Sequence, residues 1–186
     1  MGSGPADEEL MRSYGGGDAG AFEALYRRHR GSLYRFLLRQ VGEAGTAEEL
    51  FQDVWMRVID SRGRYEARAK FTSWLYAIAH NRVMDFYRAS GRAKFLAQEE
   101  SEEALEMLPA ADIPADALID RKRAAERLLA ALAELPEVQR EAFLLQQEGD
   151  LSVEEIGAAT GVSRETAKSR LRYAVAKLRA RIGEAS

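Results

Sequence analysis

The chain has 186 residues, of which 46% are hydrophobic and 31% are charged, and its formal net charge is −3. This is an ordinary composition for a water-soluble protein, and without a run of about 18 apolar residues no membrane span is available. The absence of cysteine excludes disulfides and thiolate metal sites, and the acidic stretch Asp7, Glu8 and Glu9 is not that of a secretory signal, so we expect a cytoplasmic protein.

Helical periodicity dominates the first half of the chain. A first helix is predicted to start after Asp18, because apolar residues over 22–37 recur at spacings of three and four. A second helix is predicted to open at a capping box of Thr46 and Glu49, in which a hydroxyl and a carboxylate satisfy free N–H groups of the first turn. It is expected to end near Gly63.

A third helix is predicted to begin around Thr72 and to complete a compact helical bundle over residues 10–92. Beyond it the periodic pattern fails, and residues 97–120 contain eight acidic residues but no lysine or arginine. Together with the prolines of this stretch, the acidic run predicts a flexible linker over residues 93–120. A short helix around residues 99–108 is left open.

Helical order returns over residues 119–135. Pro136 then either stops this helix or stands in the first turn of the next one, which is expected to end at Gly149. With two further helices downstream, the pattern predicts a four-helix domain over residues 121–184. The fold class is therefore all-α, with two small helical domains joined by an acidic linker.

The two downstream helices predict a helix-turn-helix. Ser152 and Glu155 form a capping box that opens the first of them, and Ser163 caps the second. Gly161 lies in the turn between them, where a tight connection tends to need a positive φ that glycine adopts without steric cost.

The last helix is strongly basic. Residues 163–182 contain seven lysines and arginines and one acid, Glu165. Such a helix fits the major groove, where its cations reach guanine edges or phosphates, although a basic helix that only faces solvent gives the same pattern. The residues predicted to face outward and to contact duplex DNA are Arg164, Glu165, Thr166, Lys168, Ser169, Arg170 and Arg172.

Aromatic and basic residues alternate between Tyr65 and Arg92. Exposed rings beside cations suit single-stranded DNA, because bases stack on the rings while the cations follow the backbone. Each ring taken singly is more often a core residue, above all Trp74 and Phe86. Tyr65 and Asn81 are therefore the better candidates for contact with DNA.

Four motifs together resemble the extracytoplasmic-function (ECF) group of bacterial sigma factors. They span residues 47–55, 71–81, 135–143 and 165–171, so the resemblance covers nearly the whole chain. It implies a factor that binds core RNA polymerase, directs promoter-specific transcription initiation and is held inactive by an anti-sigma factor. One departure is small: Ala167 stands where many relatives have valine.

The resemblance also implies a role for each site. The last helix would read the −35 element as duplex DNA, and the acidic linker would thread the basic RNA path of polymerase. The residues implied in melting and capture of a single-stranded −10 element are Tyr65, Lys70, Tyr76, Asn81, Arg82 and Arg88. The residues implied in docking on polymerase are Glu49, Gln52, Asp53 and Met56.

Two other classes of protein compete with this interpretation. A stand-alone helix-turn-helix regulator would bind duplex DNA tightly without polymerase, usually as a dimer, but no coiled-coil heptads are present. An enzyme would need a site such as a metal bound by Glu48, Glu49 and Asp53 with His29 or His80. Carboxylates at helical spacing more often face solvent or a partner, and no phosphate loop or nucleophile–base pair is visible. We therefore expect no catalytic residues, no metal and no cofactor.

Overall fold

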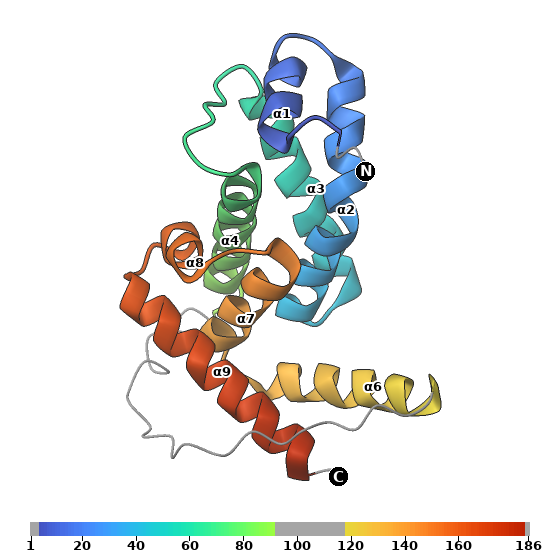
Figure 1. Cartoon of the computed structure of the whole chain (residues 1–186), viewed down its shortest axis with the longest axis vertical. Coiled ribbons are helices and arrows are strands. Elements are labelled where there is room, and N and C mark those ends of the chain that lie inside the picture. Colours follow the sequence, from blue (N-terminus) through green and yellow to red (C-terminus); the bar gives the residue numbers. More distant parts are fainter. Residues whose placement is uncertain (1–3, 92–117, 185–186) are drawn as a thin grey trace.

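The computed structural model describes residues 4–91 and 118–184, and all regular elements in these two stretches are helices. Four described helices precede the undescribed segment and four follow it, and their arrangement is shown in Figure 1. The all-α prediction is confirmed. The predicted linker lies largely outside the described residues, as does the short helix left open around residues 99–108.

The N-terminal half consists of α1 (Asp7–Gly15), α2 (Ala19–Val41), α3 (Ala44–Ser61) and α4 (Phe71–Ala89). The last three correspond to the predicted bundle. The first helix was not expected, and it packs along α2 with Leu10, Met11 and Tyr14 buried.

The caps of this half confirm one prediction and correct another. Asp18 is the N-cap of α2, and its carboxylate accepts the backbone N–H of Gly20 at 2.9 Å. The predicted capping box at Thr46 is wrong, because α3 starts earlier, at Ala44. Glu43 stands in extended backbone before it and accepts the N–H groups of Gly45 and Thr46 at 2.7 and 2.6 Å. The acid therefore satisfies the donors that the hydroxyl was expected to satisfy.

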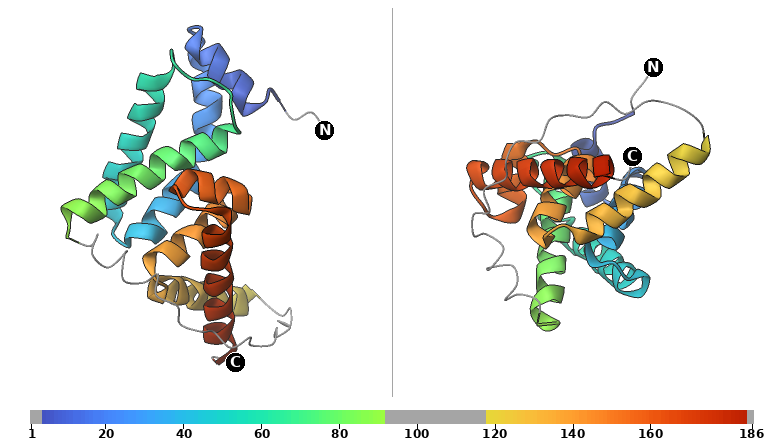
Figure 2. Two further views of the ribbon diagram at one scale, coloured as in Figure 1. Left: turned by 90° about the vertical axis from the view of Figure 1, so that its left-hand side faces the viewer. Right: turned by 90° about the horizontal axis from the view of Figure 1, so that it is seen from below.

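The C-terminal half consists of α6 (Leu118–Glu134), α7 (Glu137–Gly149), α8 (Val153–Thr160) and α9 (Arg164–Glu184). This confirms the four-helix prediction, with Pro136 as the residue that precedes α7. Figure 2 shows α9 as a long helix at the edge of the molecule, with α8 beside α4.

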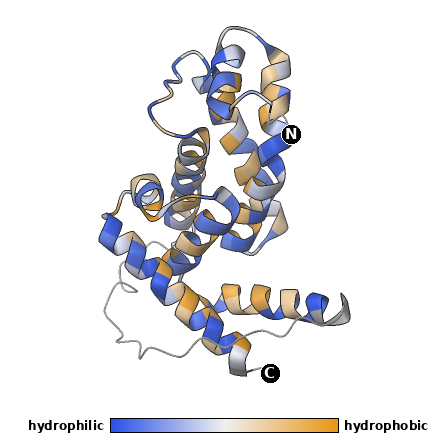
Figure 3. Cartoon of the chain, in the orientation of Figure 1, coloured by the Kyte–Doolittle hydropathy of each residue, from blue (hydrophilic) through white to orange (hydrophobic). Residues whose placement is uncertain are grey.

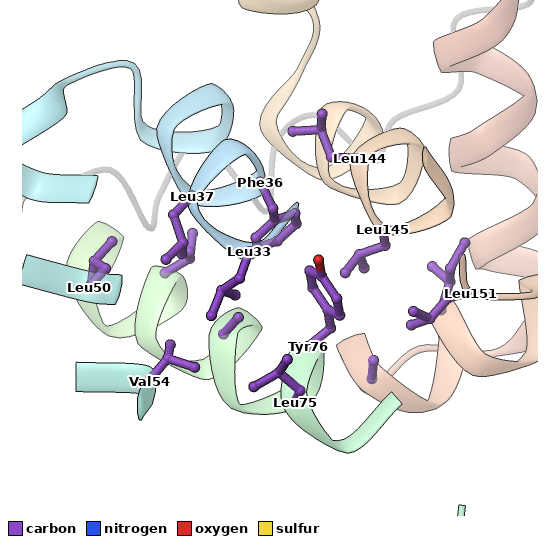
Figure 4. Close-up of a cluster of buried hydrophobic side chains, with 14 of the residues drawn as sticks. Leu33, Phe36, Leu37, Leu50, Val54, Leu75, Tyr76, Leu144, Leu145 and Leu151 are labelled. Atoms are coloured by element: carbon purple, nitrogen blue, oxygen red, sulfur yellow. The ribbon is translucent and has the colours of Figure 1, made fainter. Parts of the chain in front are cut away.

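The two halves pack against each other, α7 on α2 and α8 on α4. Figure 4 shows the ring of Tyr76 between side chains of α2, α4 and α7. The fully buried side chains gathered there include Leu33, Phe36, Leu75, Leu144 and Leu145. In this arrangement one continuous apolar core joins the halves. Among the described residues no helix is long and apolar enough to cross a membrane.

Candidate nucleic-acid and polymerase interfaces

The helix-turn-helix is formed by α8 and α9 with the geometry that the sequence predicts. Ser152 and Glu155 cap α8 reciprocally: the Ser152 N–H donates to the carboxylate at 2.7 Å, and the Glu155 N–H donates to the hydroxyl at 3.2 Å. The hydrogen bond from the Ser152 N–H is the main reason why the pKa of Glu155 lies below its ordinary value. Gly161 ends α8 with φ +71°, in the left-handed region expected for it.

The turn also brings its own backbone close to a second glycine, Gly157 of α8. A Cβ on Gly157 would lie 3.0 Å from the carbonyl oxygen of Val162, tighter than ordinary contacts. Beyond the turn, the Ser163 hydroxyl accepts the N–H of Thr166 at 3.1 Å, which caps α9 as predicted. Ala167 is 1% exposed on the inner side of α9, so the opposite side of the helix is left to solvent.

The outer face of α9 carries the predicted duplex-binding residues, which differ in how much of each is exposed to solvent. In Figure 3 the N-terminal part of α9 is mostly blue, the colour of hydrophilic residues. Those exposed are Arg164, Glu165, Lys168 and Arg172, and those half-buried are Thr166, Ser169 and Arg170. The Arg164 guanidinium pairs with Glu154 at 2.5 Å and with Glu165 at 3.1 Å. Hydrogen bonding to Glu154 raises the pKa of Arg164. Compared with Arg164, the exposed cations Lys168 and Arg172 are therefore less neutralised by nearby carboxylates.

The loop between α3 and α4 carries the first candidates for single-stranded DNA. Tyr65 is half-buried, and its ring packs edge-on against Trp74 at a centroid distance of 5.0 Å. Burial is the main cause that raises the pKa of Tyr65. The ring is thus held by Phe71 and Trp74 and remains partly accessible to solvent.

The remaining −10 candidates follow along α4. Lys70 is exposed and forms an ion pair with Glu155 of α8 at 3.2 Å. Asn81 is exposed, while Arg82 and Arg88 share the carboxylate of Asp85 at 2.6 and 2.9 Å. These residues are brought to one helix, and the pair at Lys70 links it to the helix-turn-helix.

Tyr76 corrects the sequence-based expectation. Its side chain has no exposed surface, and its hydroxyl donates to the carbonyl oxygen of Glu148 at 3.2 Å. The ring also lies against Gly149, where an added Cβ would come within 3.1 Å of it. The residue was expected to face DNA but packs under α7 instead, because the C-terminal half covers this side of α4. Burial raises the pKa of Tyr76 to about 12.

Polar contacts between the halves surround Tyr76 and were not foreseen. The Glu148 side chain, 7% exposed, pairs with Arg39 and with Arg35, the latter at 3.0 Å. On another part of the interface, His80 lies 2.6 Å from the buried carboxylate of Glu141. A single sequence gives no signal that these residues, from distant positions, would meet.

The predicted polymerase-docking face lies on α3. Glu49, Gln52, Asp53 and Met56 are all exposed, while the opposite side of the helix is buried in the core. Met56 is 54% exposed, and the other large hydrophobic residue exposed in the described part is Leu129. An exposed methionine amid acids and an amide suits a protein-binding surface. The described residues include no group of three or more histidines and acids placed to hold a metal ion.

Comparison with known protein families gives two matches in the order of the two halves. Residues 25–93 match the model of sigma-70 region 2, and residues 125–178 match the model of sigma-70 region 4. The RNA polymerase sigma factor CarQ of Myxococcus xanthus is 36% identical over 174 residues, covering 94% of this chain and 96% of that protein. The ECF RNA polymerase sigma factor SigK of Mycobacterium sp. strain KMS is 32% identical over 178 residues, and the match covers 94% of this chain and 89% of the SigK chain.

Two solved structures share the fold. CnrH, in complex with the cytosolic domain of CnrY, superposes with a TM-score of 0.69 at 22% identity, over 98% of this chain and 100% of that one. The sigma factor RpoE of Bartonella quintana, in complex with the anti-sigma factor NepR, gives a TM-score of 0.65 at 23% identity, over 87% and 96%.

Proposed function

This chain belongs to the extracytoplasmic-function group of RNA polymerase sigma factors, and from that premise we propose how its residues divide the work of promoter recognition. As a sigma factor it directs core RNA polymerase to promoters and acts in transcription initiation. We assign polymerase binding and the −10 element to residues 10–92, and the −35 element to residues 121–184. We assign the acidic connector to the segment before α6, which begins at Leu118. No catalysis is assigned to the chain, and its place of action is the cytoplasm, with polymerase.

The −35 element is read by α9. The observation that carries this proposal is the exposed basic face of α9. The helix follows a glycine turn, its N-terminus is capped, and its opposite side is buried in the core. Lys168 and Arg172 are well placed for phosphate or guanine contacts in a major groove. Glu165 is exposed beside them and can accept from a cytosine amino group.

The −10 element is captured by the loop before α4 and by the exposed side of that helix. Tyr65 offers a ring, Asn81 an amide, and Lys70, Arg82 and Arg88 offer cations to a melted strand. Because α8 lies on α4 and Glu155 holds Lys70, a strand laid along this helix competes with α8. We infer that the halves separate when polymerase binds, and that polymerase then holds the two DNA-binding sites at promoter spacing.

Regulation by an anti-sigma factor is part of the proposal. Both structural neighbours were determined with a partner bound, and for RpoE that partner is an anti-sigma factor. A partner that covers the exposed face of α3, centred on Met56, would block docking on polymerase.

Transcription in vitro with purified core polymerase on a promoter library tests the function. We expect RNA synthesis that depends on this chain and on two DNA elements, and weak binding of promoter duplex by the chain alone. Synthesis that is the same with and without the chain on every template would refute the proposal. Tight duplex binding as a dimer without polymerase would favour a stand-alone regulator instead.

The docking face is tested by charge reversal. Asp53→Lys should reduce association with core polymerase while leaving the binding of a −35 duplex by the C-terminal half unchanged, because α3 lies on the other half. Glu126→Lys, the same charge change at an exposed position of α6, is the matched control. If Glu126→Lys lowers polymerase binding as much as Asp53→Lys does, the docking face is not where we place it.

A further inference from the structure

The short helix α1 lies outside both segments that match the sigma-70 models, the first of which begins at residue 25. It nevertheless contacts the N-terminal half at the point where we place capture of the −10 strand. The loop of residues 62–70 joins α3 to α4, and α1 touches both of its ends. The contacts at the two ends are chemically different and are made by different residues of α1.

At the far end of the loop, α1 supplies a cap that α4 lacks. Lys70, the N-cap residue of α4, makes no side-chain capping hydrogen bond. The carboxylate of Glu8 accepts the backbone N–H of Phe71, the first residue of α4, at 2.6 Å. A carboxylate at this position also interacts favourably with the positive end of the helix dipole. Glu8 therefore fixes the point at which the loop ends and the helix begins.

At the near end, α1 holds the residue that ends α3. The guanidinium of Arg62 lies over the ring of Tyr14, 5.5 Å from its centroid, and donates to its hydroxyl at 3.4 Å. The backbone is equally close, because a Cβ on Gly15 would lie 2.8 Å from the carbonyl oxygen of Arg62. Since real Cβ atoms essentially never approach so closely, this contact requires glycine at the end of α1.

The helix is itself fastened to the bundle. Asp7 pairs with Arg28 at 2.8 Å and with His29 at 2.7 Å, and both partners belong to α2. The tyrosine inside the loop, Tyr65, lies within the electrostatic influence of Glu8. A helix anchored on α2 thus touches the loop at its start and end.

We propose that α1 is a positioning element for capture of the −10 strand, in which Glu8 and the close approach at Gly15 set the two ends of the loop that carries Tyr65 and Lys70. This rests on the proposed function of that loop. Neither residue needs to touch DNA. Their effect is to fix the conformation of the loop before the strand binds, so that binding requires less ordering of the loop.

The test uses reconstituted holoenzyme and two probes, a fluorescent single-stranded −10 oligonucleotide and a −35 duplex. Glu8→Ala should weaken binding of the −10 strand by about 2- to 30-fold, the range expected from loss of one helix cap, and slow promoter opening. Binding of the −35 duplex and assembly with core polymerase should stay as in the wild type. Glu8→Gln, which keeps an oxygen acceptor for Phe71, should restore most of the binding.

Two matched variants separate positioning from stability. Glu9→Ala removes the carboxylate that caps α1 itself, bonded to the Ala6 N–H at 3.2 Å, and should leave strand binding close to wild type. Gly15→Ala favours helix formation but forces the Arg62 carbonyl away, so it should weaken strand binding. Gly183→Ala, near the end of α9, is its control, because an added Cβ there meets nothing within 4 Å.

The inference is overturned if Glu8→Ala and Gly15→Ala holoenzymes hold the −10 strand as tightly as wild type. It is also overturned if they lose strand binding, duplex binding and assembly by the same factor, since that is the pattern of general destabilisation. Failure of the proposed function gives a different result, in which the wild-type chain itself starts no RNA with polymerase.

Discussion

The two helices that we propose contact DNA, α4 and α9, are presented to solvent in different ways. The outer face of α9 is open, and Lys168 and Arg172 on it are exposed. One side of α4 lies under α7 and α8, with Tyr76 fully buried and Lys70 paired to Glu155. The contrast indicates that the −35 site is accessible in the packed molecule, whereas full access to the −10 site requires the halves to part.

Removal of the Tyr76 ring, which packs between the two halves, should have the largest effect on the difference between the two sites. Tyr76→Ala leaves a cavity between α2, α4 and α7, and we expect it to lower the free energy of unfolding by about 3–5 kcal/mol, as for other buried aromatic residues. Urea unfolding measures this loss. Tyr76→Phe keeps the ring and loses only the hydrogen bond to Glu148, worth about 0.5–1.5 kcal/mol. A Tyr76→Ala chain as stable as the Phe variant would contradict the packing described.

Alkaline pH should weaken the packing around Tyr76 in the unsubstituted chain. Burial raises the pKa of Tyr76 from 10 to about 12, so the folded state holds this proton more tightly than the unfolded chain does. The associated stability is complete below pH 10 and is lost as pH rises from 10 through 12, by about 2–3 kcal/mol. Urea midpoints measured at pH 8, 10 and 11 follow the loss.

The pH experiment has an internal comparison in Tyr87, whose pKa burial also raises to about 12. Its hydroxyl donates at 2.9 Å to the carbonyl oxygen of Gln40, which also accepts a hydrogen bond from Arg140 of α7 at 3.1 Å. Tyr76→Phe should therefore retain the share of alkaline destabilisation due to Tyr87 and lose its own. Identical pH profiles for the wild type and Tyr76→Phe would exclude a role for Tyr76 in this transition.

The ion pairs across the halves should have a smaller effect. Glu148→Gln removes the charge held between Arg35 and Arg39, and because that carboxylate is 7% exposed we expect a loss of about 1–2 kcal/mol. Glu23→Gln is the control, since the Glu23–Arg27 pair is 68% and 70% exposed and such pairs contribute about 0.3–0.5 kcal/mol. Equal losses for the two variants would mean that the interhalf pair stabilises no more than a surface pair.

The sequence predicted most clearly those features that are encoded locally. The glycine turn at Gly161, the capping box at Ser152 and the exposed stripe around Asp53 depend on a few neighbouring residues, and each is present in the structure. His29, a candidate metal ligand in the enzyme interpretation, lies against Asp7 at 2.7 Å. The roles of these residues in binding DNA and polymerase remain predictions.

The features that the sequence did not predict depend on distant contacts. The helix α1 has nine residues, too few to be stable alone, and its formation depends on burial of Leu10 and Met11 against the bundle. Tyr76 lies among aromatic and basic residues, a pattern that fits DNA contact, but its partner Glu148 is 72 residues away. Periodicity gives the buried face of a helix and does not say which half of the molecule buries it.

The smallest effect on the fold, and a clear effect on function, is expected on α9. Lys168 is exposed on its outer face, so Lys168→Ala should change the free energy of unfolding by no more than about 0.5 kcal/mol. It should weaken holoenzyme binding at the −35 element by about 1–3 kcal/mol if the lysine contacts a base, with relaxed preference at one position. A contact to phosphate would weaken all sequences about equally and lower the salt dependence of binding. Because α9 is open whether or not the halves are packed, the fractional loss should be the same in a Tyr76→Ala background, and a loss that depends on that background would show that packing also controls the −35 site.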